Sequence, residues 1–302
     1  MIGMGNHVKS VGLVGVGLVG GVLAKGLLSA GLHVRGYDLA PDRRDYLQRL
    51  GGVVVANAAA AADGVDCVLL SLPDGDVVQQ VVEGPGGVVE AGRWPSYIID
   101  TTTGDPNGTA ALAGRLARQG IALLDATISG SSKQVSERKA VFMVGGERAA
   151  LEVCLTVLHI FSDRVFYLGP SGSGSKAKLA TNLVLGLNRL VLAEGLVFAE
   201  ELGLDLVAFL DVLKAGPAYS VAVDVKGEKM LRADFTPDSR IRQHHKDVSL
   251  ILNYAAASGQ DLPLSRVHLD ILARTMAAGE GDLDTCAVIK EIKRRRAHRA
   301  TE

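Results

Sequence analysis

The stretch that decides the fold is SVGLVGVGLVG at residues 10–20, where a short apolar run leads into a glycine-rich turn. Residues 10–14 have the composition of a buried strand, and residues 20–30 have the apolar spacing of a helix. A G-x-G-x-x-G pattern between a strand and a helix is typical of a turn that binds the pyrophosphate of a dinucleotide. The pattern consists of Gly15, Val16, Gly17, Leu18, Val19 and Gly20.

An acidic residue after the second predicted strand supports this interpretation. Asp38 follows residues 33–37, near the offset of about 20 residues at which an acidic side chain meets the adenosine ribose. A carboxylate there accepts hydrogen bonds from the ribose hydroxyls and repels a 2′-phosphate, so NAD is favoured over NADP as the cofactor. Arg43 and Arg44 follow closely and could offset the repulsion, which leaves NADP open.

Beyond the turn, short strand-like runs alternate with helical segments, which predicts an α/β fold with an N-terminal Rossmann, doubly wound parallel sheet. The predicted strands are residues 10–14, 33–37, 67–71, 97–100, 122–125, 141–144 and 164–167. The predicted helices between them include residues 20–30, 40–50, 77–82 and 109–119.

The pattern changes after Leu168, where a run rich in glycine and serine precedes long helical segments. These segments are residues 176–202, 205–213, 221–230, 241–258 and 264–278. We therefore expect two domains: a Rossmann NAD(P)-binding domain at 9–169 and an all-helical substrate and oligomerisation domain at 170–302. The first long helix is apolar around much of its circumference, so it should be buried in its own domain or against another subunit. A homodimer or homotetramer is expected.

Composition narrows the class of protein. Of the 302 residues, 48% are hydrophobic and 22% charged, and the formal net charge is −1, which favours a globular protein with a small-molecule partner over nucleic acid or a membrane surface. Cys67, Cys154 and Cys286 form no CxxC pair, so a reducing, cytoplasmic location fits best. Residues 11–23 could imitate a secretory signal, but their glycines suit a phosphate-binding turn better. No apolar run reaches the roughly 18 residues of a membrane span.

The order of motifs resembles the β-hydroxyacid dehydrogenase family, which includes 3-hydroxyisobutyrate dehydrogenase and tartronate semialdehyde reductase, within the 6-phosphogluconate dehydrogenase-like superfamily. The likeness covers nearly the whole chain. It rests on the glycine-rich turn, Leu72-Pro73, Asp125-Ala126-Thr127-Ile128-Ser129-Gly130, Met143-Val144-Gly145-Gly146, Gly172-Ser173-Gly174 with Lys178 and Asn182, and Lys246-Asp247.

The resemblance implies an NAD(P)-dependent oxidoreductase that interconverts a small β-hydroxy acid and its semialdehyde or keto form. In that family a lysine at the place of Lys178 exchanges a proton with the substrate oxygen, and an amide at the place of Asn182 orients the substrate. The two residues lie one helical turn apart and so share a helix face. Charge develops on oxygen as hydride moves to or from carbon, so the reaction needs such a proton donor.

The resemblance also implies the binding residues. Ser129, Gly130 and Ser131 should hold the substrate carboxylate, although Thr127 replaces the usual proline and Ser131 the usual second glycine, which puts the substrate in doubt. Lys246 should reach the nicotinamide and substrate, and Thr102 should lie near both. Leu72 and Pro73 should form a lip over the adenine side of the cofactor.

Two other features invite functional interpretations that we do not favour. His244 and His245 are adjacent, so they point different ways on a helix, and no metal is expected. The basic run Lys293-Arg294-Arg295-Arg296 with Arg299 has no aromatic partners, and it is better interpreted as a solvated helix end.

Three alternatives stay open. The chain could be an imine-reducing relative, although such enzymes usually lack the lysine at position 178. It could be a dehydrogenase of a phosphorylated sugar acid, with Arg240 and Arg242 holding the phosphate. It could also be a catalytically silent dinucleotide-binding module.

Overall fold

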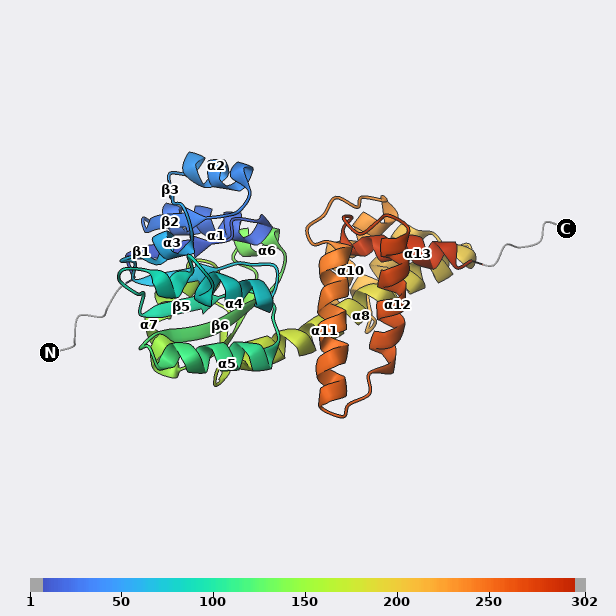
Figure 1. Cartoon of the computed structure of the whole chain (residues 1–302). Coiled ribbons are helices and arrows are strands. Elements are labelled where there is room, and N and C mark those ends of the chain that lie inside the picture. The colour runs from blue at the N-terminus through green and yellow to red at the C-terminus, as the bar shows by residue number, and fades with distance from the viewer. Residues whose placement is uncertain (1–7, 297–302) are drawn as a thin grey trace. The chain divides into compact units, whose positions relative to one another are not determined.

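The chain folds into two compact units. The computed structural model describes residues 8–296, and the chain divides into unit 1, Met1–Lys178, and unit 2, Leu179–Glu302. Unit 1 contains the sheet, and unit 2 is helical (Figure 1).

Unit 1 is built on one sheet of eight strands in the order β3-β2-β1-β4-β5-β6-β7-β8. The strands are β1 (Ser10–Val14), β2 (His33–Tyr37), β3 (Val53–Val54), β4 (Cys67–Leu70), β5 (Tyr97–Asp100), β6 (Ala122–Ser129), β7 (Val141–Gly145) and β8 (Val165–Gly169). Strand β1 pairs in parallel with β2 on one side and β4 on the other. The carboxyl ends of β1 and β4 therefore flank a topological switch point, where open α/β sheets bind their ligands.

The prediction of a parallel sheet is wrong for two strands. Strand β7 pairs antiparallel with β6, and β8 then pairs in parallel with β7. Residues 130–140 connect β6 to β7 and include one short helix, α6 (Ser132–Ser136). A parallel crossover usually takes a dozen or more residues, so this connection returns the chain directly alongside β6 in the opposite direction.

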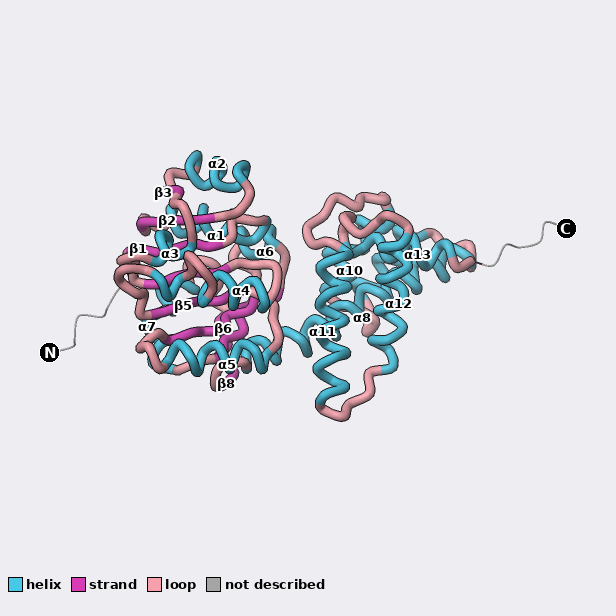
Figure 2. The backbone as a smooth tube through the Cα atoms, viewed as in Figure 1, coloured by secondary structure: helices cyan, strands magenta, loops and turns pink. Residues whose placement is uncertain are grey.

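Helices cover both faces of the sheet (Figure 2). Unit 1 contains α1 (Leu18–Ser29), α2 (Pro41–Arg49), α3 (Ala58–Ala62), α4 (Gly75–Glu83), α5 (Pro106–Ala117), α6, α7 (Arg148–Leu158) and a 3₁₀ turn, η1 (Val88–Glu90). Neighbouring residues of one strand enter opposite cores: Leu69 packs with α1 and α7, whereas Leu70 packs with α3, α4 and α5. The central strands are therefore apolar on both faces, as the sequence predicted. Residues 11–23, which could imitate a secretory signal, lie in β1, the glycine-rich turn and the start of α1.

Unit 2 is a helical bundle. Helix α8 (Ser173–Glu201) begins in unit 1 and continues into unit 2. It is followed by α9 (Leu206–Ala215), α10 (Val221–Leu231), α11 (Ile241–Ala257), α12 (Pro263–Ala277), a 3₁₀ turn η2 (Thr285–Ala287) and α13 (Val288–Arg294). Leu190 and Leu196 of α8 are buried in the core of the bundle, whereas Val191 and Phe198 on the same helix are exposed by 66% and 62%. One apolar face of α8 is thus uncovered in the single chain.

Helix α8 is also the one helix in the described part of the chain that is long and apolar enough to cross a membrane by length and composition. Half of its most apolar window is buried within the protein. That burial is typical of the core helix of a soluble protein, and the helix carries Lys176 and Lys178 in its first turns.

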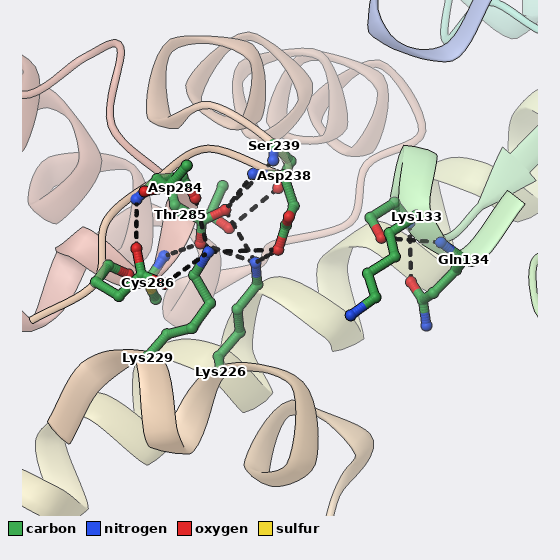
Figure 3. A network of polar contacts seen from close by, with 12 residues as sticks. Lys133, Gln134, Lys226, Lys229, Asp238, Ser239, Asp284, Thr285 and Cys286 are labelled. Carbon is green, nitrogen blue, oxygen red and sulfur yellow. Dashed lines mark hydrogen bonds and ion pairs between the residues drawn. The ribbon is translucent and has the colours of Figure 1, made fainter. Parts of the chain in front are cut away.

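Unit 2 also buries an ion pair (Figure 3). The ammonium of Lys226, on α10, lies 2.8 Å from a carboxylate oxygen of Asp284, which has no exposed surface. Asp284 also accepts backbone hydrogen bonds from Asp238 and Cys286. Burial alone would raise the pKa of Asp284, but the hydrogen bond and charge of Lys226 lower it to about 2. One carboxylate thus joins α10 to the loop before α11 and to η2.

The basic run lies at the largely exposed end of α13, as the sequence predicted, and its arginines also form ion pairs there. Arg294 pairs with Glu280, Arg295 with Asp270, and Arg296 with Glu200, because acidic residues of α8, α12 and the following loop face it. Arg299 lies outside the described residues.

Candidate active site

Five strands of unit 1 bring the predicted binding residues to one edge of the sheet. Strands β1, β2, β4, β5 and β6 are parallel to one another, so their carboxyl ends meet at the same edge. The residues at these strand ends are Gly15 to Gly20 after β1, Asp38 after β2, Leu72 and Pro73 after β4, Thr102 after β5, and Ser129, Gly130 and Ser131 at the end of β6. This gathering is what a ligand site at a switch point requires.

The glycine-rich turn after β1 is shaped by close backbone approaches. Gly15 has φ +90°, and a Cβ there would lie 2.2 Å from the carbonyl oxygen of Ser71. A Cβ on Gly20 would lie 2.0 Å from the carbonyl oxygen of Gly15. A Cβ on Gly17 would have no neighbour within 4 Å, so the backbone is open at this position. The first and third glycines therefore close the turn, and the second leaves space for a phosphate beside the start of α1.

Asp38 is tied to this turn. One of its carboxylate oxygens accepts a hydrogen bond from the backbone N–H of Val16 at 2.7 Å, and the other accepts from Ala40 at 2.9 Å. Arg44 donates to the backbone carbonyl oxygens of Asp38 and Leu39 instead of pairing with the carboxylate. The Asp38 carboxylate is therefore not paired with Arg44, and each of its oxygens retains a lone pair for a ribose hydroxyl.

The ends of β4 and β5 are also linked. The backbone N–H of Leu72 donates to the hydroxyl oxygen of Thr102 at 3.1 Å, and the N–H of Thr102 donates to the buried carboxylate of Asp100 at 2.9 Å. Burial raises the pKa of Asp100 to about 7, although Thr102 opposes the shift and the nearby charge of Asp125 adds to it. The predicted lip residue and the predicted threonine thus belong to one hydrogen-bonded segment.

The first turn of α8 is fixed to β6 by two buried side chains. Asp125 accepts hydrogen bonds from the backbone N–H groups of Gly172 and Ser175, each at 2.8 Å. The hydroxyl of Thr127 donates to the carbonyl oxygen of Gly174 at 2.9 Å, a bond that a proline could not make. Burial raises the pKa of Asp125 even though these backbone groups oppose the shift.

Two glycines make this approach possible. A Cβ on Gly174 would lie 2.2 Å from the carbonyl oxygen of Asp125. A Cβ on Gly145, at the end of β7, would lie 2.6 Å from an Asp125 carboxylate oxygen and 2.8 Å from the backbone nitrogen of Gly174. The two glycine motifs quoted from the sequence, 143–146 and 172–174, therefore lie together where the first turn of α8 packs against β6 and β7.

Lys178 extends from this fixed turn to the end of β6. Its ammonium donates to the carbonyl oxygen of Ile128 at 2.5 Å, and the side chain is half-buried. Ile128 immediately precedes Ser129 and Gly130, so the predicted proton donor and the predicted carboxylate-binding turn lie together within unit 1. Gly130 has φ +144°, which turns the chain out of the strand.

The backbone N–H and the hydroxyl of Ser131 bind Gln134, whereas the sequence predicted that Ser131 would bind the substrate. Its backbone N–H donates to the side-chain oxygen of Gln134 at 2.8 Å, and its hydroxyl oxygen accepts from the backbone N–H of Gln134 at 3.3 Å. This reciprocal pair is a capping box for α6. Serine followed three residues later by glutamine was the signal in the sequence, and our sequence analysis missed it.

The remaining predicted residues form a second group within unit 2. Asn182 donates from its amide nitrogen to the carboxylate of Asp247 at 3.1 Å, and the ammonium of Lys246 lies 3.3 Å from the same carboxylate group. Asp247, quoted only as part of a motif, therefore links two predicted site residues. An amide whose nitrogen donates to a carboxylate has its oxygen free to accept a hydrogen bond from a substrate hydroxyl.

The histidines belong to the bundle. His244 is buried with its ring 5.0 Å from that of His268, and a Cβ on Gly186 of α8 would lie 2.5 Å from the His244 ring. Among residues 8–296, no group of three His, Cys, Asp or Glu side chains is placed to hold a metal ion.

Two protein families match the chain, one over residues 10–169 and the other over residues 172–292. Residues 10–169 match the family described as the NAD binding domain of 6-phosphogluconate dehydrogenase. Residues 172–292 match the family described as the NAD-binding domain of NADP-dependent 3-hydroxyisobutyrate dehydrogenase.

Several of the similar proteins are dehydrogenases. The 2-(hydroxymethyl)glutarate dehydrogenase of Eubacterium barkeri is 31% identical over 241 residues, which are 80% of each chain. A probable 3-hydroxyisobutyrate dehydrogenase of Mycobacterium tuberculosis is 31% identical over 87% of this chain and 90% of its own. The solved structure of Mycobacterium tuberculosis 3-hydroxyisobutyrate dehydrogenase with L-serine has a TM-score of 0.86 at 29% identity, and covers 96% of this chain and 100% of that one.

Proposed function

The chain belongs to the β-hydroxyacid dehydrogenase family, and we propose that Lys178 is the general acid and base of its reaction. It is an NAD(P)-dependent oxidoreductase that acts on the CH–OH group of small hydroxy acids. The observation that supports the role of Lys178 is its hydrogen bond to Ile128, which holds the ammonium beside the Ser129 turn.

The proposed roles follow from the chemistry of each group. The nicotinamide, when bound, exchanges a hydride with the substrate carbon. Lys178 takes the proton of the substrate hydroxyl during oxidation and returns one to the carbonyl oxygen during reduction. Asn182 orients that oxygen, and Ser129 with Gly130 holds the substrate carboxylate.

The remaining assignments are also proposals. Ser131 borders the carboxylate pocket through the turn that it caps, and Thr102 and Lys246 lie near both cofactor and substrate. Leu72 and Pro73 border the adenine side of the cofactor. The Rossmann domain at 9–169 binds NAD(P), and the helical domain at 170–302 serves in substrate binding and oligomerisation.

A substrate panel with two lysine variants tests this function. Purified protein is assayed with 3-hydroxyisobutyrate, 3-hydroxypropionate and L-serine, in the presence of NAD or NADP. Lys178→Ala should lower kcat by about 100- to 10,000-fold while NAD binding is unchanged, because only proton transfer is lost. The control Lys176→Ala changes an exposed lysine of the same helix and should keep normal activity. Equal turnover in Lys178→Ala and wild type would refute the mechanism.

We propose NAD as the preferred cofactor because the Asp38 carboxylate stands beside the glycine-rich turn. The ratio of kcat/KM with NAD to that with NADP should exceed one. Asp38→Asn keeps an acceptor for the Val16 N–H but removes the charge that repels a 2′-phosphate, so the ratio should fall about tenfold. A wild-type preference for NADP would contradict the assignment.

We propose that the protein is a cytoplasmic homodimer or homotetramer. The exposed apolar side chains of α8, among them Val184, Val191 and Phe198, lie along one helix and would be covered by a second copy. Light scattering should give the mass of two or four chains, and Phe198→Glu should shift it to that of one chain, 31.6 kDa. A wild-type mass of one chain would contradict the proposal.

A further inference from the structure

The short segment that follows the carboxylate-binding turn carries polar groups that the roles above do not use. Residues 129–134 leave β6, turn at Gly130 and enter α6. Lys178 reaches the carbonyl oxygen just before this segment, so a substrate whose oxygen contacts Lys178 lies next to it.

A backbone N–H in this segment is occupied. The N–H of Ser131 points to the side-chain oxygen of Gln134 at 2.8 Å, which is a full hydrogen bond. A backbone donor used in this way cannot at the same time donate to a substrate carboxylate. The turn therefore needs another donor at this point if it holds a carboxylate.

Gln134 supplies one. Because its carboxamide oxygen accepts from Ser131, the amide nitrogen at the other end of the group is turned away from the backbone, and Figure 3 shows this nitrogen directed away from both hydrogen bonds of the residue. The nitrogen carries two hydrogens and is a donor only. No hydrogen bond from it to any residue in 8–296 is formed, and the side chain is partly exposed.

Lys133 adds positive charge to the same segment. Its side chain is 74% exposed, and the nearest carboxylate oxygen, on Glu137, is 3.9 Å away. Glu137 lies closer to Lys139, at 2.9 Å. The ammonium of Lys133 is therefore weakly neutralised and favours an anion beside α6.

We propose that Gln134 determines substrate specificity: its amide nitrogen, supported by the charge of Lys133, donates to the substrate carboxylate in place of the Ser131 backbone N–H. This inference rests on the proposed function. The donor is thereby moved outward from the backbone by the width of a carboxamide group, so the pocket recognises a carboxylate farther from the turn than a backbone amide would.

Three variants and two probes test the proposal. Gln134→Met keeps the side-chain length and covers Ser131, but has no donor, whereas Gln134→Ala exposes the Ser131 N–H. With 3-hydroxyisobutyrate, KM should rise about 10- to 100-fold in Gln134→Met, less in Gln134→Ala, and about threefold in Lys133→Gln, with kcat within about twofold throughout. Gln119→Met, on an exposed surface of unit 1, is the matched control.

The methyl ester of 3-hydroxyisobutyrate separates recognition from a structural effect. Wild type should prefer the acid, and Gln134→Met should lose most of this preference because the ester offers no charged acceptor. An unchanged or lower KM for the acid in Gln134→Met, or an unchanged preference for acid over ester, would overturn the proposal.

Calorimetry of 3-hydroxyisobutyrate binding in the presence of NAD distinguishes a failure of the proposed function from a failure of the inference about Gln134 alone. If wild type neither binds nor oxidises the acid, the proposed function fails and this inference fails with it. If wild type binds the acid and Gln134→Met binds it equally, only the inference about Gln134 is overturned.

Discussion

Unit 1 and unit 2 stabilise their buried carboxylates in opposite ways. In unit 1, Asp100 accepts a hydrogen bond from one backbone N–H group and Asp125 from two, and burial raises the pKa of each. In unit 2, Asp284 is paired with the ammonium of Lys226, and its pKa is lowered to about 2. Among the described residues, every buried lysine, arginine and histidine belongs to unit 2. The comparison teaches that a nearby full charge outweighs desolvation, whereas a few backbone dipoles only reduce it.

The largest loss of stability is expected from breaking the Lys226–Asp284 ion pair of unit 2. Asp284→Asn leaves Lys226 buried with a neutral neighbour, and removing one partner of a buried pair costs about 3–5 kcal/mol. Hydrogen exchange measured by mass spectrometry should show faster exchange in α10, η2 and the start of α11. Asp282→Asn removes a neighbouring carboxylate that is 69% exposed, and should cost under about 1 kcal/mol. Equal effects of the two variants would contradict the comparison.

The second prediction concerns the pH dependence of unit 1. Asp100 has a pKa of 3.8 when unfolded and about 7 when folded. The folded state therefore binds the proton more tightly, so this group's contribution is complete below pH 3.8 and is lost as the pH rises to about 7. The shift corresponds to on the order of 4 kcal/mol, since one pKa unit is about 1.4 kcal/mol.

Asp100→Asn should remove that pH dependence while retaining an acceptor for the N–H of Thr102. The single tryptophan, Trp94, lies in unit 1, so its fluorescence during urea unfolding reports on this unit. The difference between wild type and Asp100→Asn should change between pH 4 and pH 7 in favour of the variant. A constant difference over this range would show that Asp100 is ionised throughout.

The smallest loss of stability is expected from removing an uncharged hydrogen bond of unit 1, the one from Thr127 to Gly174. Thr127→Val deletes the hydrogen bond to Gly174 without changing the side-chain shape, and should cost about 1 kcal/mol by Trp94 fluorescence. Because this contact fixes the turn that carries Lys178, kcat should fall about three- to tenfold. Thr127→Ser should restore both values. A loss of stability with unchanged kcat would show that Thr127 supports the fold alone.

The sequence predicted those parts of the molecule that local patterns determine. Strands β1, β2 and β5 have the predicted bounds, and the glycine-rich turn begins directly after β1, as predicted. The contacts of Asp125 and Thr127 with residues 172–175 could not be predicted, because they join segments 47 to 50 positions apart. The reversed direction of β7 also escaped prediction, because periodicity gives the position of a strand and not its orientation.

Other parts were missed for local reasons. Strand β3 has two residues and helix α3 is a run of five alanines, so neither shows a period. Apolar residues all around α8 predicted burial in its own domain or against another subunit, because composition alone does not distinguish a core face from a face that a second chain would cover.

Gly145 and Gly174 have a consequence for any attempt to change what this enzyme accepts. Neither position has room for a methyl group, because β7 and the first turn of α8 approach closely there. We therefore expect most random substitutions at these two positions to prevent folding. The neighbouring residues 131–134 carry no such restriction, because Ser131 and Lys133 are partly or largely open to solvent. Substitutions within residues 131–134 can therefore change which substrate is accepted, whereas Gly145 and Gly174 should be kept.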